Sequence, residues 1–203
     1  MQPLRTFADS ADIRQALQRV GELLAAAGEE YGIVIVGGAA LNLMGAVRRA
    51  TRDVDILAFA RGRGRSARLE PPPTPLPDVL AAAIHTVGRD MGLADTWLNA
   101  DPALQWKQGL PRGLAGRVKW RKYGALRVGI VGRADMIRFK LYAAADDHPA
   151  GRHVSDLVAL HPSDAELREA ARWVKRQDAA PQFPAFVDQV VAHVRSLWAA
   201  RAR

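Results

Sequence analysis

The amino-acid sequence predicts an α+β protein, in which a small mixed sheet is flanked by helices and followed by a C-terminal helical extension. Three observations predict this class. Strand-length apolar runs alternate with helical patterns as far as residue 91, two adjacent strand patterns over 117–131 predict a hairpin, and every pattern from residue 134 onward is helical. The length of 203 residues suits one medium domain with a small extension. We therefore expect a core over residues 1–132 and a helical part over residues 133–203 packed on that core.

The first 60 residues predict two helices and two strands. Apolar side chains at helical spacing follow an N-capping pair, whereas the two strand segments are short continuous apolar runs of the kind that is buried on both faces. In chain order the expected elements are a helix from Asp9 and Ser10 to about Gly28, a strand over 31–36, a helix over 39–47 and a strand over 54–59.

A basic, proline-rich segment follows, and it predicts a loop. Four arginines lie between Arg61 and Arg68, and five prolines lie between Pro71 and Pro77, which excludes a helix or a central strand there. This loop either contacts RNA phosphates or is a solvated linker. The remaining expected elements are a helix over 78–91, irregular chain over 97–116, a hairpin of 117–123 and 126–131, and helices over 134–145, 152–160, 163–177 and 184–200.

The composition restricts the classes of function. A net charge of +8 favours a polyanionic partner, either nucleic acid or a nucleoside triphosphate, although it also fits a host that uses arginine generously. The absence of cysteine excludes disulfides, thiolate metal sites and a cysteine nucleophile. No window approaches the roughly 18 apolar residues of a membrane span, and the N-terminus has no signal-peptide pattern. We expect a cytoplasmic protein without a membrane partner.

The segment from Gly37 to Asp55 carries the strongest chemical signal. Two glycines follow a strand and precede a helix, where backbone amides can approach phosphate oxygens at the helix N-terminus. Asp53 and Asp55 alternate along the next strand and so project to one face, where a divalent cation would relieve their repulsion. A dinucleotide-binding turn is the competing interpretation, but Gly45 does not complete its glycine spacing, and the acids precede the apolar run instead of ending it.

These motifs resemble the DNA polymerase beta-like nucleotidyltransferase superfamily. The likeness rests on Gly-Gly-x-Ala-Leu at residues 37–41 and on Thr51-x-Asp53-Val54-Asp55-Ile56. Within the superfamily, the chain resembles the bacterial branch that contains the abortive-infection nucleotidyltransferase toxins. It implies a nucleotidyltransferase-like sheet, a nucleoside triphosphate substrate bound at Gly37, Gly38 and Thr51, and Mg²⁺ (or Mn²⁺) held by Asp53 and Asp55. It further implies an RNA acceptor, such as the 3′ end of a tRNA, or a protein hydroxyl, and a cognate antitoxin as partner.

Two later segments, over residues 135–144 and 152–157, are similar to further motifs of that superfamily. They add two catalytic candidates, Lys140 and Asp156. Lys140 lies on the apolar stripe of its predicted helix, so its ammonium needs a partner or must extend to the surface. The resemblance implies that Lys140 neutralises charge on the reacting phosphate and that Asp156 orients it. The alternative for Asp156 is a surface ion pair with Arg152, four residues earlier.

The sequence departs from the superfamily in one important respect. Many members use a third carboxylate on a neighbouring strand, but the strand patterns over 117–131 contain basic residues and no acid. Asp95 and Asp101 are nearby in irregular chain, and His153 stands where the later motif usually has its first aspartate. The alternative function is therefore a non-catalytic RNA- or nucleotide-binding module on a degenerate nucleotidyltransferase fold, such as a toxin-antitoxin component.

Overall fold

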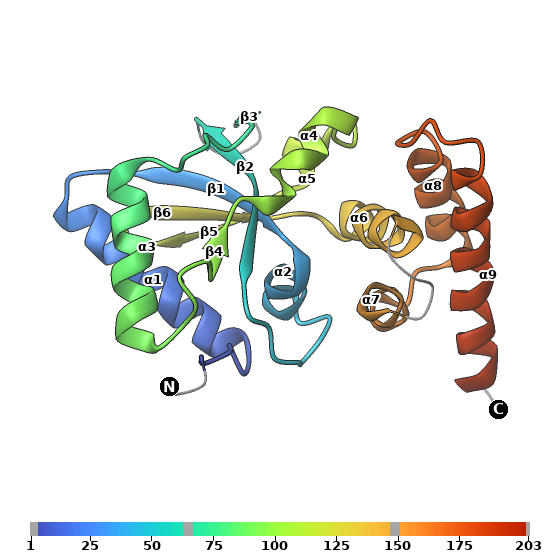
Figure 1. Ribbon diagram of the computed structural model, residues 1–203, viewed down its shortest axis with the longest axis horizontal. Coiled ribbons are helices and arrows are strands. Elements are labelled where there is room, and N and C mark those ends of the chain that lie inside the picture. The colour runs from blue at the N-terminus through green and yellow to red at the C-terminus, as the bar shows by residue number, and fades with distance from the viewer. Residues whose placement is uncertain (1–3, 63–66, 147–150, 202–203) are drawn as a thin grey trace. The chain divides into compact units, whose positions relative to one another are not determined.

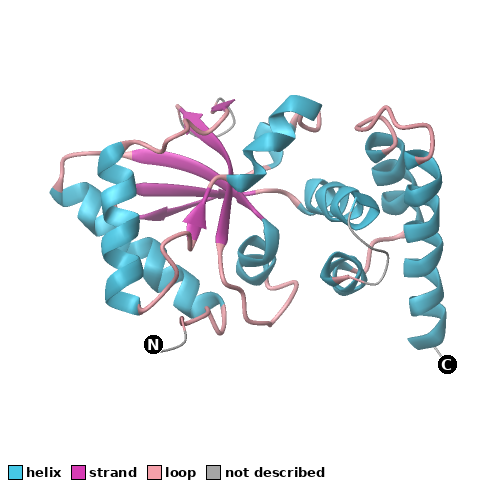
Figure 2. Ribbon diagram, viewed as in Figure 1, coloured by secondary structure: helices cyan, strands magenta, loops and turns pink. Residues whose placement is uncertain are grey.

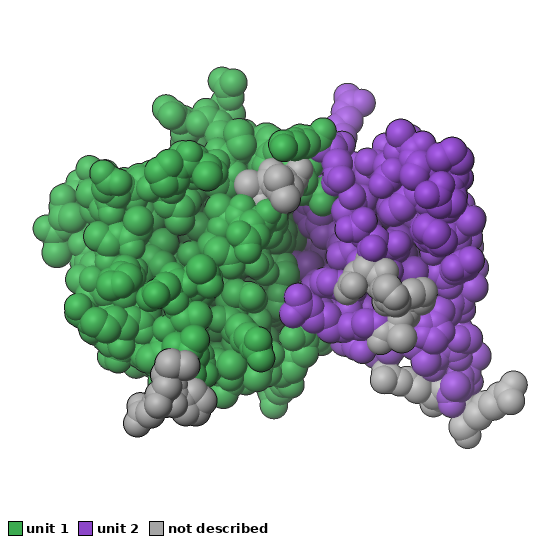
Figure 3. Space-filling model, viewed as in Figure 1, with its two compact units in different colours: residues 1–107, 113–131 green, residues 108–112, 132–203 purple. Residues whose placement is uncertain are grey.

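A computed structural model describes residues 4–62, 67–146 and 151–201. It divides the chain into two compact units, which Figure 3 shows in different colours. The first unit comprises residues 1–107 and 113–131, and the second comprises residues 108–112 and 132–203. Each unit is described by itself below.

A mixed sheet forms the centre of the first unit. Its strands are β1 (Tyr31–Val36), β2 (Val54–Arg61), β3 (Arg68–Glu70), β4 (Leu98–Asn99), β5 (Lys119–Tyr123) and β6 (Leu126–Ile130). Five of them follow the order β3-β2-β1-β6-β5, and β4 pairs with β2 off this path (Figure 1). The β1–β6 and β2–β4 pairs are parallel, whereas the other pairs are antiparallel. The expected α+β class with a mixed sheet is thus confirmed.

The central strand of this sheet is β1, as its uninterrupted apolar composition predicts. Ile33, Val34 and Ile35 are completely buried. β1 lies between β2 and β6 and runs directly into the turn at Gly37. The buried central strand therefore fixes the position of the turn that follows it.

Two long helices cover one face of the sheet, and a shorter one follows β1. They are α1 (Ser10–Ala26), α3 (Asp78–Met91) and α2 (Gly37–Met44). Asp9 caps α1 by accepting hydrogen bonds from the backbone N–H groups of Ala11 and Asp12. α1 packs against α3 and against β5 and β6 (Figure 1). Its apolar stripe is buried by these contacts. The helix expected over 39–47 begins two residues earlier, and it ends at Met44 because Gly45 forms a left-handed C-cap.

The structure contains short elements where the sequence predicts only loop. β3 begins at Arg68, the last arginine of the basic segment, and pairs antiparallel with β2, whereas Arg63 and Arg65 lie outside the described residues. The segment expected to be irregular contains β4, a 3-10 helix η2 (Asp101–Leu104) and the one-turn helices α4 (Gln105–Gln108) and α5 (Leu114–Arg117). Trp97 anchors it, because its buried indole N–H donates to the carbonyl of Ile84 at 2.9 Å.

The described residues of the second unit form four helices, which agree with the predicted C-terminal helical region (Figure 2). They are α6 (Arg133–Asp146), α7 (Arg152–Leu160), α8 (Asp164–Val174) and α9 (Phe183–Arg201). α6 packs against the other three. Ser163 and Glu166 form a capping box at the start of α8. Over the described ranges, no helix combines the length and the apolarity that crossing a membrane would require.

Candidate active site

The turn between β1 and α2 is shaped around a carboxylate. Gly37 has φ +77°, in the left-handed region that favours glycine. A Cβ atom added at Gly37 would collide with Oδ2 of Asp55, so the carboxylate occupies the space that a side chain would need. Position 37 therefore requires glycine for two reasons, the positive φ of its backbone and the close approach of the Asp55 carboxylate.

The second glycine faces a hydroxyl and a guanidinium. A Cβ atom added at Gly38 would lie 2.9 Å from Oγ1 of Thr51 and 3.3 Å from Nη2 of Arg49. The backbone N–H groups in the first turn of an α-helix have no partner within the helix, and they attract anions. Arg49, which was not among the predicted site residues, thus adds a positive charge beside a helix N-terminus.

Buried Asn42 explains how Arg49 is positioned. Its side chain donates to the carbonyl of Arg49 at 3.0 Å and accepts from the backbone N–H of Arg49 at 3.4 Å. The same amide donates to the carbonyl of Gly38 at 3.2 Å. Asn42 is only 4% exposed on an otherwise apolar helix. A single polar residue in an apolar pattern is the feature of the sequence that could have indicated this buried hydrogen-bonding role.

Thr51 links the turn to the first acid. Its backbone pairs with that of Phe7 through two hydrogen bonds, of 2.9 and 3.0 Å, which hold the segment before β2. Its hydroxyl lies 3.4 Å from Oδ1 of Asp53. The contacts run from Gly37 to Asp55, from Gly38 to Thr51 and from Thr51 to Asp53, so the structure brings these predicted residues together around one turn.

The two acids are half-buried at the start of β2. Asp53 precedes the strand, and Asp55 is its second residue. In the sheet, Asp55 lies between Val36 of β1 and Asn99 of β4. Nδ2 of Asn99 is 3.5 Å from Oδ1 of Asp55. Asn99 is a second residue that the sequence did not indicate, because β4 was not predicted.

The donor set of these residues fits a hard divalent cation. Two aspartate carboxylates supply the charged oxygen ligands that Mg²⁺ and Mn²⁺ prefer. No group of three or more His, Cys, Asp or Glu side chains within the described ranges is arranged to hold a metal. The candidate cation site therefore rests on Asp53 and Asp55. β5, at the edge of the sheet beyond β1 and β6, presents exposed Lys119, Arg121 and Lys122, as its sequence indicates.

Lys140 and Asp156 lie in the second unit, on α6 and α7. Nζ of Lys140 is 2.8 Å from Oδ2 of Asp156, and the two side chains are 7% and 2% exposed. The structure thus brings these two predicted residues together as a buried ion pair. The alternative of a surface Asp156 is wrong, and Lys140 does not extend to solvent, because the inward ammonium has a buried carboxylate as its partner.

The comparison with protein families matches the part of the chain that holds the glycine turn and the two acids. Residues 12–66 match the model of a family described as a nucleotidyltransferase of unknown function (DUF6036). The match includes Gly37, Gly38, Thr51, Asp53 and Asp55, whereas Lys140 and Asp156 lie beyond it. No curated protein and no solved structure gave a significant match to the chain.

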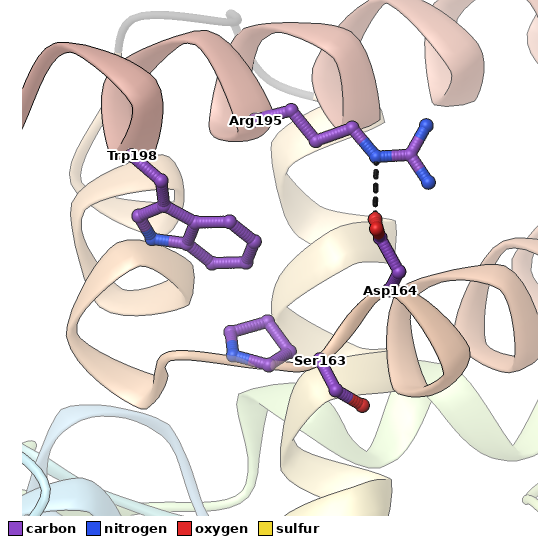
Figure 4. Close-up of a pocket in the computed structure, with 5 residues that line it drawn as sticks. Ser163, Asp164, Arg195 and Trp198 are labelled. Carbon is purple, nitrogen blue, oxygen red and sulfur yellow. Dashed lines mark hydrogen bonds and ion pairs between the residues drawn. The ribbon is translucent and has the colours of Figure 1, made fainter. Parts of the chain in front are cut away.

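A separate hollow of about 470 Å³ lies in the second unit (Figure 4). It is lined by Pro162, Ser163, Asp164, Arg195 and Trp198. Nε of Arg195 contacts Oδ1 of Asp164 at 2.8 Å across it. None of its lining residues was predicted as a site residue, and we assign no function to it.

Proposed function

We propose that this protein is a metal-dependent nucleotidyltransferase, which transfers a nucleoside monophosphate from a nucleoside triphosphate to an RNA hydroxyl, such as the 3′ end of a tRNA, or to a protein hydroxyl. The observation that carries the proposal is the packing of the Asp55 carboxylate against Gly37, at the N-terminus of α2, within the segment that matches the nucleotidyltransferase family. In this arrangement, groups that attract phosphate lie directly beside groups that attract a cation.

Each residue around the turn has a separate task in the proposed reaction. The N–H groups at the start of α2 and the guanidinium of Arg49 bind phosphate oxygens, and the hydroxyl of Thr51 lies between Gly38 and the Asp53 carboxylate. Asp53 and Asp55 hold the divalent cation, which when bound neutralises negative charge on the triphosphate. The acceptor oxygen bonds to the α-phosphorus, pyrophosphate leaves and the hydroxyl proton passes to water. Such in-line chemistry depends mostly on positioning and charge neutralisation.

The test is transfer of label from the α-phosphate. The full chain is incubated with each α-labelled nucleoside triphosphate and Mg²⁺ or Mn²⁺, with and without total RNA, and label is followed in RNA and in protein. The parent should transfer label from at least one nucleotide. The Asp53→Asn, Asp55→Asn double variant should lose transfer by at least about two orders of magnitude, since it removes the cation ligands.

A matched control separates loss of the site from a general change in charge. Glu22 and Asp90 are exposed acids of the first unit, so Glu22→Gln with Asp90→Asn makes the same change of net charge at a distance from the turn in sequence. This control should transfer at the parent rate. Nucleotide binding by the parent without transfer to either acceptor would contradict the proposal and favour the non-catalytic binding module, with a cognate antitoxin or RNA as its partner.

The catalytic roles of Lys140 and Asp156 are a further part of the proposal, supported by the sequence resemblance. A variant carrying both Lys140→Met and Asp156→Leu removes the two charges together, so that neither stays in the interior without the other. Transfer should fall in this variant even though it folds. A folded double variant with the parent rate would restrict the pair to a structural role.

A further inference from the structure

The pairing of β4 with β2 places an amide next to the candidate cation ligands. The two strands run parallel, with Leu98 opposite Val54 and Asn99 opposite Asp55. Paired residues of neighbouring strands point to the same face, and the strands themselves lie about 4.8 Å apart. The side chain of Asn99 is therefore the neighbour of the Asp55 carboxylate on the β4 side.

This amide is held firmly in one orientation. The backbone N–H of Asp101 donates to Oδ1 of Asn99 at 2.9 Å, and Nδ2 of Asn99 is 3.3 Å from the carbonyl of Thr96. A backbone N–H can only donate, so it identifies the amide oxygen, and the NH₂ group consequently faces Asp55. The strand is anchored as well, because the backbone N–H of Val54 donates to the carbonyl of Trp97, which is fully buried.

Charge decides what this amide does to the site. Asp53 and Asp55 together carry two negative charges, which one divalent cation neutralises. Asn99 adds no charge, and it presents a donor to Oδ1 of Asp55, where a carboxylate would present a further metal ligand. We propose that Asn99 is a positioning residue, which orients the Asp55 carboxylate and, as a neutral amide where a third carboxylate could stand, leaves the pair with the ligands for a single divalent cation. This inference rests on the proposed function, because it concerns the same site.

The test counts bound Mn²⁺ on the full chain without nucleotide, by electron paramagnetic resonance of the free ion during a titration. The parent should bind one Mn²⁺ per chain, and Asp53→Asn with Asp55→Asn should abolish that binding. Asn99→Asp supplies a third carboxylate at the same place in the sheet, so it should bind a second Mn²⁺ and hold the first at least about tenfold more tightly.

Two controls isolate the effect of position 99. Gln15→Glu makes the same amide-to-acid change on the exposed face of α1, and it should leave the number and affinity of bound Mn²⁺ unchanged. Asn99→Ala removes the donor without adding charge, and it should still bind one Mn²⁺, several-fold more weakly, because Asp55 is no longer oriented. Circular dichroism establishes that each variant is folded.

The outcomes distinguish this inference from the function on which it rests. If the parent binds one Mn²⁺ through Asp53 and Asp55 and a folded Asn99→Asp also binds one with unchanged affinity, the role of Asn99 is refuted and the cation site stands. If the parent already binds two at the pair, the restriction to one cation is likewise refuted. If the parent binds none through these acids, the cation site of the proposed function fails, and the inference about Asn99 fails with it.

Discussion

The buried ion pair of the second unit allows a stability prediction with a defined magnitude. In the Lys140→Met variant the Asp156 carboxylate, which is 2% exposed, loses the ammonium that lies 2.8 Å away. Breaking a buried pair by removing one partner costs about 3–5 kcal/mol, because the remaining charge stays in the interior without the ion that faced it. That is a large fraction of the roughly 5–15 kcal/mol by which domains are stable. Replacing both partners, as in Lys140→Met with Asp156→Leu, should cost no more than about 1 kcal/mol.

The same unit offers a control of matched chemistry. Nζ of Lys175 lies 2.7 Å from Oδ2 of Asp188, but these side chains are 34% and 64% exposed. Lys175→Met should therefore cost less than about 1 kcal/mol, as exposed pairs do. The assay is urea unfolding followed by far-ultraviolet circular dichroism and tryptophan fluorescence, whose coincidence tests two-state behaviour. The reasoning is refuted if Lys140→Met costs no more than Lys175→Met, or if the two single changes at the buried pair add up to the effect of the double change.

Two further predictions concern the glycine turn and the response to acid. Gly37→Ala should destabilise the protein and weaken Mn²⁺ binding, because the new methyl group collides with Asp55. Gly28→Ala is the control, since Gly28 has a similar φ of +74° but no atom lies near the added Cβ, and it should affect stability alone. Equal Mn²⁺ affinity in the two variants would contradict this prediction. The hydrogen bond from Arg133 holds the pKa of Glu166 below its ordinary value of 4.5, so this carboxylate contributes stability above pH 4.5 that is lost as the pH falls through the lower folded-state pKa. Glu166→Gln should therefore flatten the fall in melting temperature below pH 4.5, and an unchanged acid profile would show that the Arg133 contact contributes nothing.

Local sequence patterns were sufficient for most of the architecture. The capped apolar stripe of α1, the continuous apolar run of β1 and the helical patterns of α6–α9 each predict an element that the structure contains. The α+β class follows from their order. The turn at Gly37 and the alternation of Asp53 and Asp55 also lie within one short segment, so a candidate site could be proposed from them directly. Periodicity and turn chemistry act over a few residues, so these elements and this segment could be predicted from the sequence.

Only the tertiary structure decided which groups meet across long stretches of chain. Asn99 reaches Asp55 from a two-residue strand too short to show a period, and the hydrogen bond between them joins residues 44 positions apart. The partner of Lys140 likewise comes from another helix, and Arg49 is brought to Gly38 by the fold of a loop around Asn42. Strand register and helix packing are set by the burial of the whole core, and no local pattern encodes them. The charge of the candidate site and the identity of its neutral neighbour are therefore properties of the folded chain.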